Sequence, residues 1–415
     1  MRLYDESDVS SLSVRERSAL TLPALAPRSD IVAMLDRLVA FDTTSRNSNL
    51  ALIDMAAETL SRLGAEIRLT WNDSVTKANL FATLGPADRP GIVLSGHTDV
   101  VPVDGQAWSS DPFHLDNRDG LLYGRGTADM KGFLAAALAF APDFAACPLA
   151  MPIHFALSYD EEIGCIGVRR LLDDLAGLEV RPRLCIVGEP TEMTVVSGHK
   201  GKKSVRCEVL GHECHSALND QGVNAVEIAA EIVARLRAMQ RRLRETGPFD
   251  SGYRPPYTTV HTGVIKGGTA LNIVPGECSF EFEIRNLPRH DPDGLMAEIR
   301  YWAEELLPEM RARSSRAGII FDENNSTAGL DMDANDPGVR LVQSLAGDTG
   351  TAFVSYTTEA GLFQHSGIPA VVCGPGNIAQ AHKADEFVSL DQLARCESFL
   401  GRLLDYATNP EPGRF

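Results

Sequence analysis

Several apolar runs in this sequence end in side chains that can bind a metal ion. The run GIVLSGHTDVVP, residues 91–102, begins like a buried strand and then places His97 and Asp99 two residues apart. A single acid or histidine in such a position is usually a helix cap or a solvated loop residue. Here the pattern recurs, and the residues concerned are His97, Asp99, Asp129, Asp160, Glu161, Glu162, Glu189 and His382. Together they indicate one common site.

Imidazole and carboxylate ligands together favour zinc, cobalt or manganese, because magnesium and calcium prefer oxygen ligands only. Two histidines and several acids also exceed the three protein ligands that are usual for one catalytic zinc. The surplus predicts two divalent metal ions, which lie about 3.5–4 Å apart in such sites and need a carboxylate between them. Asp129, in GRGTADMKG, has no acidic or histidine neighbour in its motif and is the candidate bridge.

The spacing of the other acids suggests separate roles for them. Asp99 lies two residues after His97 on the same strand face, so it is placed to hold the second imidazole nitrogen rather than to bind metal. Glu161 and Glu162 are adjacent and point in roughly opposite directions in an extended segment. One can bind metal while the other acts as general base toward a water whose pKa the metal lowers to about 7. The spacing leaves open which glutamate does which.

These residues need a scaffold that brings distant strand ends together. Helical and strand-like apolar patterns alternate from about residue 30, with strands expected at ANLFATLG, GIVLSGHTDV, PIHFALSYD and RLCIVGEP. This alternation predicts an α/β domain with a mainly parallel sheet that is covered on both faces. In such sheets ligands bind beyond the carboxyl ends of the strands, where most of the candidate ligands lie.

A second domain is expected within the first. From about residue 194 the expected order becomes strand, long helix, two strands, helix and strand, the split βαββαβ pattern of a ferredoxin-like two-layer domain. Alternating α/β order then returns. We therefore expect a metal-binding catalytic domain of residues 1–193 and 325–415 that carries an inserted domain of residues 194–324. A chain of 415 residues also exceeds the size that one hydrophobic core usually supports.

The composition limits the classes of partner. The net charge of −17 argues against nucleic acid or an anionic membrane, since both need basic patches. No segment reaches the roughly 18 consecutive apolar residues of a membrane helix, and the first residues lack the apolar core of a signal peptide. The eight cysteines are scattered without a CxxC pair, which favours reduced thiols. We expect a cytoplasmic protein that acts on a small molecule.

The motifs that carry these residues resemble one enzyme family. GHTDVVP, GRGTADMKG, SYDEEIGCIG, GEPT and AHKADEF follow the order found in the co-catalytic metallopeptidase family of acetylornithine deacetylase, succinyl-diaminopimelate desuccinylase, aminoacylase and glutamate carboxypeptidase. The resemblance covers nearly the whole chain from about residue 30. It implies two metal ions, zinc first and cobalt or manganese as alternatives, with Asp129 bridging them and Glu161 as general base. The metal ligands that it implies are His97, Asp129, Glu162, Glu189 and His382.

In this family the inserted domain forms a homodimer, closes over the site and lends it residues, sometimes across the subunit interface. The resemblance implies that His215 donates to the oxyanion of the tetrahedral intermediate and that Asn272 contacts substrate. It implies that Arg285 binds a substrate carboxylate in bidentate geometry. An alternative for Arg285 is an ion pair with Glu281 or Glu283, which share its strand face.

Among the branches of the family, DMKGF, EEIGCIGVRRLL and YTTEAGLFQHSGIPAVVCGPGNIAQAHKADEF are most similar to acetylornithine deacetylase. That branch releases ornithine and acetate from N-acetyl-L-ornithine in arginine biosynthesis. It would place Thr357, Thr358 and Glu359 near the metal site, with Glu359 paired with the distal ammonium of the substrate. Residues 1–28 depart from the shorter start usual in that branch.

Several alternatives stay open at this point. The substrate could be N-succinyl-diaminopimelate, another N-acyl amino acid or a dipeptide. The metal site could instead serve hydrolytic deamination of a non-peptide substrate. A catalytically silent binding protein on the same scaffold is the alternative that is not an enzyme, although all six ligand and base positions hold competent residues.

Overall fold

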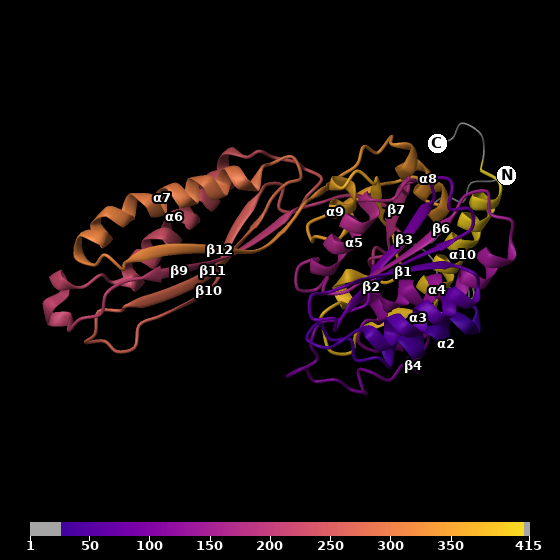
Figure 1. The fold of residues 1–415 in the computed structure, drawn as a ribbon, viewed down its shortest axis with the longest axis horizontal. Helices are drawn as coiled ribbons and strands as arrows, with labels where there is room; N and C mark the ends of the chain where they lie inside the picture. The colour runs from indigo at the N-terminus through magenta and orange to yellow at the C-terminus, as the bar shows by residue number, and fades with distance from the viewer. Residues whose placement is uncertain (1–25, 411–415) are drawn as a thin grey trace, which may run out of the picture.

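The computed structural model describes residues 26–410, so most of the N-terminal segment singled out in the sequence lies outside the described residues. The described residues form a large α/β domain and an elongated second domain that projects from one side of it (Figure 1). The first elements of the large domain are α2 (Ser29–Val39), α3 (Leu50–Arg62), β1 (Glu66–Trp71), β2 (Ala78–Leu84), β3 (Ile92–His97), β4 (Asp116–Arg118), β5 (Leu121–Tyr123), η2 (Thr127–Lys131), α4 (Gly132–Ala146), β6 (Ile153–Ser158), α5 (Ile166–Ala176), β7 (Leu184–Val187) and β8 (Val196–His199). Its later elements are β13 (Leu330–Asp331), α8 (Pro337–Ala346), β14 (Ala352–Val354), α9 (Ala360–His365), β15 (Ala370–Val372), η4 (Ile378–Gln380), β16 (Phe387–Ser389) and α10 (Leu390–Thr408).

The large sheet follows the order β1-β2-β6-β3-β7-β15-β8-β13, and β14 also pairs with β8. The neighbours β6, β3, β7 and β15 are parallel to one another, as are β14 and β8. The remaining pairs, β1–β2, β2–β6, β15–β8 and β8–β13, are antiparallel. The expected α/β fold is confirmed, but the sheet is mixed, with a parallel centre and antiparallel flanks. Strands β1 and β2 are antiparallel because a short turn joins them without a crossover helix.

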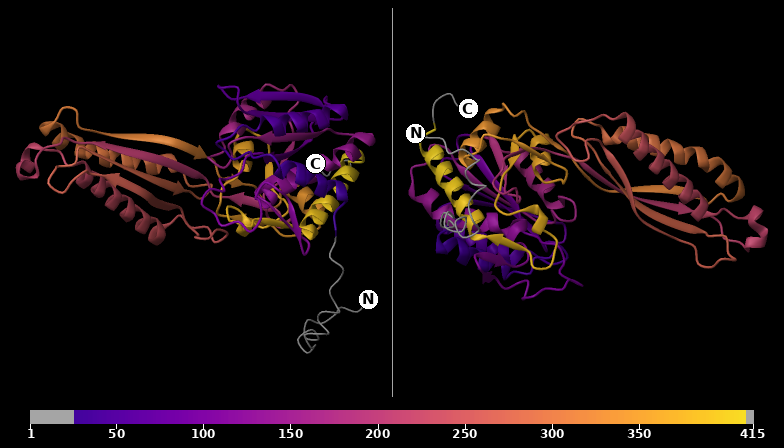
Figure 2. Two further views of the ribbon diagram at one scale, coloured as in Figure 1. Left: turned by 90° about the horizontal axis from the view of Figure 1, so that it is seen from below. Right: turned by 180° about the vertical axis from the view of Figure 1, so that it is seen from behind.

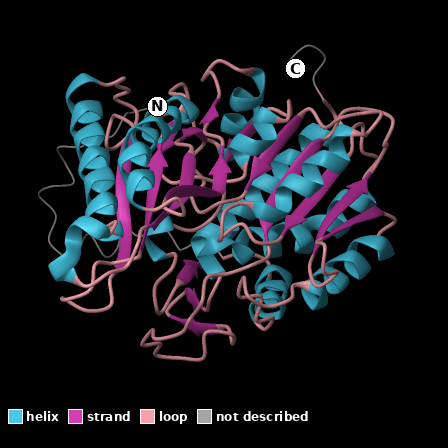
Figure 3. Cartoon of the chain, turned by 60° about the vertical axis from the view of Figure 1, so that its left-hand side comes forward, coloured by secondary structure: helices cyan, strands magenta, loops and turns pink. Residues whose placement is uncertain are grey.

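The central strands are buried on both faces. Every residue of β3, β6 and β7 is buried, which requires helices on both sides of the sheet. Helices lie across the strands in Figure 3, and α4 packs against both α2 and α10. Polar side chains of these strands can therefore reach a substrate only at the strand ends, which is where the candidate ligands are placed.

The second domain has the predicted βαββαβ order and a hydrophobic core of its own. Its four strands form an antiparallel sheet in the order β10-β11-β9-β12. Buried residues alternate along β9 and β11, so one face of the sheet is covered and the other is open. Helices α6 and α7 cover that face (Figures 1 and 2). Its elements are β9 (Lys202–Leu210), η3 (Ser216–Gln221), α6 (Ala225–Thr246), β10 (Thr259–Gly267), β11 (Glu277–Arg285), α7 (Pro292–Arg313) and β12 (Gly318–Thr327).

The chain passes between the two domains at two neighbouring places. Strand β8 pairs with β13 in the large sheet, with His199 opposite Leu330. Between these strands and the second domain, Gly201 and Gly329 lie so close that a Cβ on either would be 3.0 Å from the other's nitrogen. We propose that the insert comprises residues 202–327, because β8 belongs to the large sheet. The limits expected from the sequence, 194–324, begin about eight residues and end about three residues earlier.

A small sheet connects the end of the chain to its middle. Strand β16 pairs with β5, and β5 pairs with β4. This pairing places the loop before β16, which carries His382, beside the segment that leads from β5 to Asp129. Residues more than 250 positions apart in the sequence are thereby brought to one end of the large sheet.

Helix length and the state of the cysteines complete the description of the fold. Within residues 26–410, no helix combines the length and the apolar character needed to cross a membrane. All eight cysteines fall in this range, and each is a free thiol.

Candidate metal centre

The candidate ligands lie at the carboxyl ends of adjacent parallel strands. Strand β3 ends at His97, β6 is followed by Glu161 and Glu162, and β7 is followed by Glu189. Because β6, β3 and β7 are neighbours and run the same way, their ends meet at one edge of the sheet. Asp129 reaches this edge from the irregular segment before α4. The strand ends therefore lie together, and their joint role as a metal site stays a prediction.

Asp129 is the centre of the cluster because its two oxygens approach two different histidines. Its Oδ1 lies 3.0 Å from Nε2 of His97, and its Oδ2 lies 3.4 Å from Nε2 of His382. The Nε2 atom of His97 is 3.7 Å from Glu189, and that of His382 is 3.0 Å from Glu162. The arrangement has two halves that share one carboxylate, which is the geometry expected for a bridging ligand.

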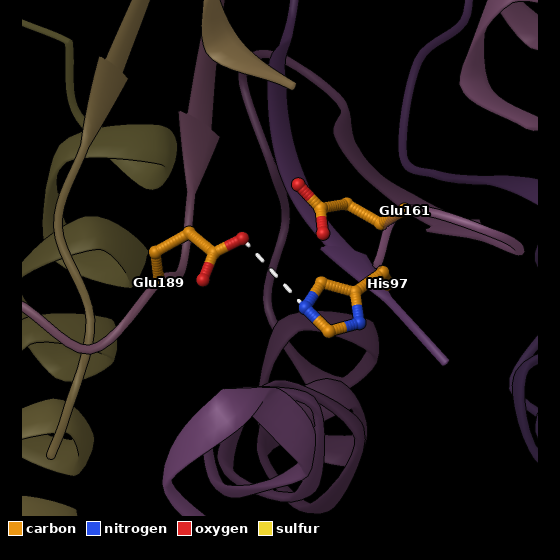
Figure 4. A group of neighbouring side chains, drawn as sticks. All are labelled: His97, Glu161 and Glu189. Carbon is orange, nitrogen blue, oxygen red and sulfur yellow. Dashed lines mark ion pairs between the residues drawn. The ribbon is translucent and has the colours of Figure 1, made fainter. Parts of the chain in front are cut away.

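The positions of the two glutamates after β6 do not by themselves separate ligand from base. One possible ligand atom from each of His97, Glu161 and Glu189 lies within 4.8 Å of the other two, and the same holds for His97, Asp129 and Glu162. Figure 4 shows Glu161 and Glu189 both directed toward the imidazole of His97. The assignment of Glu161 as base and Glu162 as ligand therefore still depends on the family resemblance.

The electrostatics of the cluster favour a bound cation. Burial raises the pKa of Glu161 and of Glu189 well above the ordinary value, and it raises that of Glu162 to about 7. For Asp129 burial acts in the same direction, but hydrogen bonds with the two histidines outweigh it and lower the pKa. Four carboxylates share this confined space with two imidazoles. A buried carboxylate cluster is costly without positive charge, so the donor set fits divalent ions.

Asp99 holds His97 through a different atom from the one expected. The Nδ1 of His97 lies 2.8 Å from the main-chain oxygen of Asp99 and 3.7 Å from its carboxylate. The carboxylate instead accepts the main-chain N–H groups of Glu161, at 3.0 Å, and Glu162, at 3.3 Å, and the hydroxyl of Ser45, at 2.7 Å. Strand β3 ends at His97, so the shared strand face does not have to persist to Asp99. Asp99 therefore fixes the imidazole and also the turn that bears both glutamates.

Asp160 faces away from the cluster and forms an ion pair with Lys77. Its positive φ of 55° turns the chain directly after β6. The next two side chains, Glu161 and Glu162, are thereby directed to the cluster. Of the three consecutive acids, only these two take part.

Glu359 lies beneath the cluster rather than on an open surface. Its carboxylate is only 1% exposed and accepts a hydrogen bond of 2.6 Å from Ser158. Burial raises its pKa to about 7. The hydroxyl of Thr358 accepts the main-chain N–H of Ala360 at 3.1 Å, and the hydroxyl of Thr357 donates to the main-chain oxygen of Lys200 at 2.9 Å. Contact between Glu359 and a substrate ammonium stays a prediction, and it would require the surrounding residues to open.

Two of the three insert residues, His215 and Asn272, do not reach the metal centre within one chain. Strand β9 begins next to the large domain at Lys202 and ends at Leu210, at the remote end of the insert (Figure 1), and His215 follows five residues later. Asn272 lies at the same end, where its main-chain oxygen accepts the N–H of Ser216 at 3.0 Å. These two residues adjoin each other but not the metal centre of their own chain.

Arg285 lies at the opposite end of the insert, next to the large domain. Its guanidinium contacts the carboxylate of Glu283 through Nε at 2.9 Å and Nη2 at 3.3 Å. This is the ion pair considered as the alternative in the sequence. A substrate carboxylate would have to replace or share this partner.

Three side chains around the centre were not singled out in the sequence. Cys165 donates its thiol to Glu161 at 3.3 Å, and Arg125 and Glu386 form an ion pair with both side chains 1% exposed. All three stand inside the quoted motifs SYDEEIGCIG, GRGTADMKG and AHKADEF. For Arg125 and Glu386 the available signal was a charged residue four positions from a candidate ligand within the same motif, but only the fold shows that the two side chains meet.

Comparison with known sequences identifies relatives along most of the chain. Residues 93–406 match the family described as peptidase family M20/M25/M40. An acetylornithine deacetylase from Myxococcus xanthus is 38% identical over 388 residues, covering 92% of this chain and 97% of that protein. An acetylornithine deacetylase from Photorhabdus laumondii is 33% identical over 371 residues, covering 88% and 93%.

Solved structures share the fold at lower identity. A tripeptidase from Staphylococcus aureus superposes with a TM-score of 0.67 at 22% identity, covering 92% of this chain and 98% of that one. A dinuclear metal-binding peptidase from Bacillus subtilis superposes with a TM-score of 0.60 at 14% identity, covering 91% and 98%. The expected family resemblance and the mixed α/β fold are confirmed by these matches.

Proposed function

The chain belongs to peptidase family M20/M25/M40, and we propose that it is a two-metal amidohydrolase whose substrate is N-acetyl-L-ornithine. The family match and the deacetylase relatives establish a metal-dependent hydrolase of amide bonds in N-acyl amino acids. The choice of acetylornithine is supported by the names of both similar relatives. The observation that carries the two-metal proposal is Asp129, whose two oxygens each approach a different histidine.

The donor set fits two divalent ions that share Asp129. His97 and Glu189 would complete one position, and Glu162 and His382 would complete the other. Mixed imidazole and carboxylate donors favour zinc, with cobalt or manganese as alternatives. When bound, the ions would polarise the amide carbonyl and lower the pKa of the attacking water.

Glu161 is proposed to take the proton from the attacking water and pass it to the leaving amine. Burial raises the pKa of this carboxyl group, which suits a group that must both accept and release a proton. The Asp99 carboxylate holds the main-chain N–H of Glu161, and the thiol of Cys165 donates to its Oε1. The side chain is thereby held in one orientation toward the cluster.

The remaining substrate contacts are proposed to come from the insert. Arg285, at the end of the insert next to the large domain, would bind the substrate carboxylate. His215 and Asn272 lie at the remote end, so they would act on the metal centre of a partner subunit. A homodimer formed through the insert is therefore part of the proposal. A cytoplasmic location is also proposed, and the free thiols support it.

The proposal is tested by amine release from N-acetyl-L-ornithine, N-succinyl-diaminopimelate and a panel of N-acyl amino acids. Chelated protein should be inactive, and zinc or cobalt should restore turnover with a preference for acetylornithine. Glu161→Gln should keep its metal content while kcat falls by roughly 10²–10⁴-fold, the usual contribution of a general base. Glu179→Gln, a change of the same kind at an exposed residue in the bend after α5, should leave kcat unchanged.

Other outcomes would support other readings. Metal-dependent turnover of a different amide would keep the mechanism and replace the substrate. Failure to hydrolyse any amide would favour a silent binding protein or deamination chemistry. Near-normal turnover by Glu161→Gln would remove Glu161 from its role.

A further inference from the structure

Two loops that carry candidate metal ligands meet behind the metal centre at Glu386. The Oε1 atom of Glu386 accepts the main-chain N–H groups of Ala128, at 2.9 Å, and Asp129, at 3.0 Å. Its main-chain oxygen accepts the N–H of Gly124 at 3.0 Å. Glu386 follows His382 by four residues. One carboxylate therefore fixes the backbone of the bridging aspartate from within the loop of the second histidine.

Arg125 extends this connection to the other side of the loop. Its Nη1 donates to Glu386 Oε2 at 2.7 Å and to the main-chain oxygen of Lys383 at 3.2 Å. Its Nη2 donates to Oε1 of Gln106 at 2.5 Å. The amide nitrogen of Gln106 in turn donates to the main-chain oxygen of His382 at 2.9 Å. The chain of contacts thus runs from Asp129 through two buried charges to His382.

The loop that these contacts hold has an unfavourable backbone conformation. His382 and Asp385 have positive φ values of 64° and 55°, which cost free energy for residues other than glycine. Such conformations persist only where the surroundings impose them. Besides the contacts from Arg125 and Gln106, Asp385 accepts the N–H and the hydroxyl of Ser109, both at 2.9 Å. The neighbouring segment therefore determines where the imidazole of His382 points.

A fully buried ion pair is a weak source of stability, because removing both charges from water costs about as much as their attraction returns. A positioning role gives a better account of Arg125 and Glu386, whose hydrogen bonds go to ligand-bearing loops. We propose that Arg125 and Glu386, with Gln106, position Asp129 and His382 and thereby set the affinity of one of the two metal positions. This inference rests on the proposed two-metal function.

The two metal positions should depend unequally on this network. At the metal position between Asp129, Glu162 and His382, the network holds two of the ligands, Asp129 and His382. At the metal position between His97, Glu189 and Asp129, the network holds only the shared Asp129. Loss of the network should therefore weaken one equivalent of metal more than the other.

The test is a calorimetric titration of chelator-treated protein with Zn²⁺, and with Co²⁺ followed by its absorption spectrum. Glu386→Gln keeps the shape of the side chain but leaves the Arg125 charge unpaired. Gln106→Ala is a milder change at a half-buried residue. Gln343→Ala is the matched control, because Gln343 also donates its amide to loop carbonyls, at Thr349 and Gly350, outside the metal centre. His382→Ala identifies which equivalent belongs to the position of His382.

We expect Glu386→Gln to weaken the same equivalent as His382→Ala, by about 10–100-fold, the usual effect of a residue that orients a ligand. Gln106→Ala should weaken that equivalent by about 3–10-fold, at or below the low end of the usual range, with urea unfolding of the metal-free protein unchanged. The other equivalent should change by less than about threefold, and excess metal should restore kcat. Gln343→Ala should bind both equivalents like the unaltered protein.

The inference is overturned if both equivalents weaken alike, or if metal binding is unchanged while only the unfolding midpoint moves. If Glu386→Gln does not fold, Gln106→Ala decides alone, and an unchanged titration for it overturns the inference. An unaltered protein that binds fewer than two equivalents overturns the two-metal function itself. That result is distinguishable because it appears before any substitution is made.

Discussion

Replacing Asp99 by asparagine should weaken the turn that carries Glu161 and Glu162. The new amide side chain can be placed in two orientations. In the less costly one its oxygen still accepts the N–H of Glu161, and its NH₂ group takes the place of Oδ2. The Ser45 hydroxyl can rotate to accept from this group, but the N–H of Glu162 then faces another donor. An unsatisfied buried donor costs about 1–3 kcal/mol, and loss of charge from the remaining bond adds about 1 kcal/mol. The expected loss in free energy of unfolding is therefore about 3 kcal/mol.

Urea unfolding of the chelated protein at pH 7 measures this loss without the contribution of bound metal. Ser45→Ala is the matched control, because it removes one bond to the same carboxylate and should cost about 1 kcal/mol. In the metal-loaded protein, Asp99→Asn should also lower kcat/KM by about 10–100-fold, since the glutamates lose their fixed backbone. The reasoning fails if Asp99→Asn costs no more than Ser45→Ala, or if its kcat/KM is unchanged.

Two further substitutions test the scaffold. Gly374→Ala should lower the free energy of unfolding by about 3 kcal/mol, because its Cβ would lie 2.0 Å from the main-chain oxygen of Gly188. Gly401→Ala, in open space on α10, should leave stability unchanged or raise it, and similar losses for both would contradict the clash. Burial lowers the pKa of His154 to about 4, against about 6.5 in an unfolded chain, so its contribution to stability is present above pH 6.5 and is lost as the pH falls toward 4. His154→Gln should reduce this pH dependence by about 3 kcal/mol over that window, whereas parallel pH profiles of urea unfolding would show that His154 titrates normally.

The convergence of the ligands could be predicted from the sequence because it depends on strand ends. Apolar runs that stop at His97, Glu161 and Glu189 must end at one edge if the strands are parallel neighbours, and they do. The order of strands and helices in the insert could also be predicted, because apolar residues alternate along its strands and recur at helical spacing in its long helices. Both inferences use regular geometry that side-chain spacing encodes directly.

The details of the site depend on irregular backbone, which spacing does not encode. Asp99 uses its main-chain oxygen on His97 because the chain has left the strand at that point. Asp160 turns away from the cluster through a positive φ. The pairing of Arg125 with Glu386 requires the small sheet that joins β5 to β16, and neither short strand has a strong pattern of its own. The antiparallel strands at the flanks of the large sheet could not be predicted either, because the general alternation of helices and strands does not distinguish them from parallel strands.

The position of β15 has a consequence for the order of assembly. This strand lies between β7 and β8, although the whole insert separates it from them in sequence. The insert consists of contacts among residues 202–327 and can fold as soon as these are synthesised. The large sheet, in contrast, keeps a gap between β7 and β8 until Ala370–Val372 arrives. His382 follows ten residues after that strand. A chain whose synthesis stops before residue 370 would therefore have a folded insert and a large sheet without its β15 strand. The last part of the chain both completes this sheet and supplies the last candidate metal ligand.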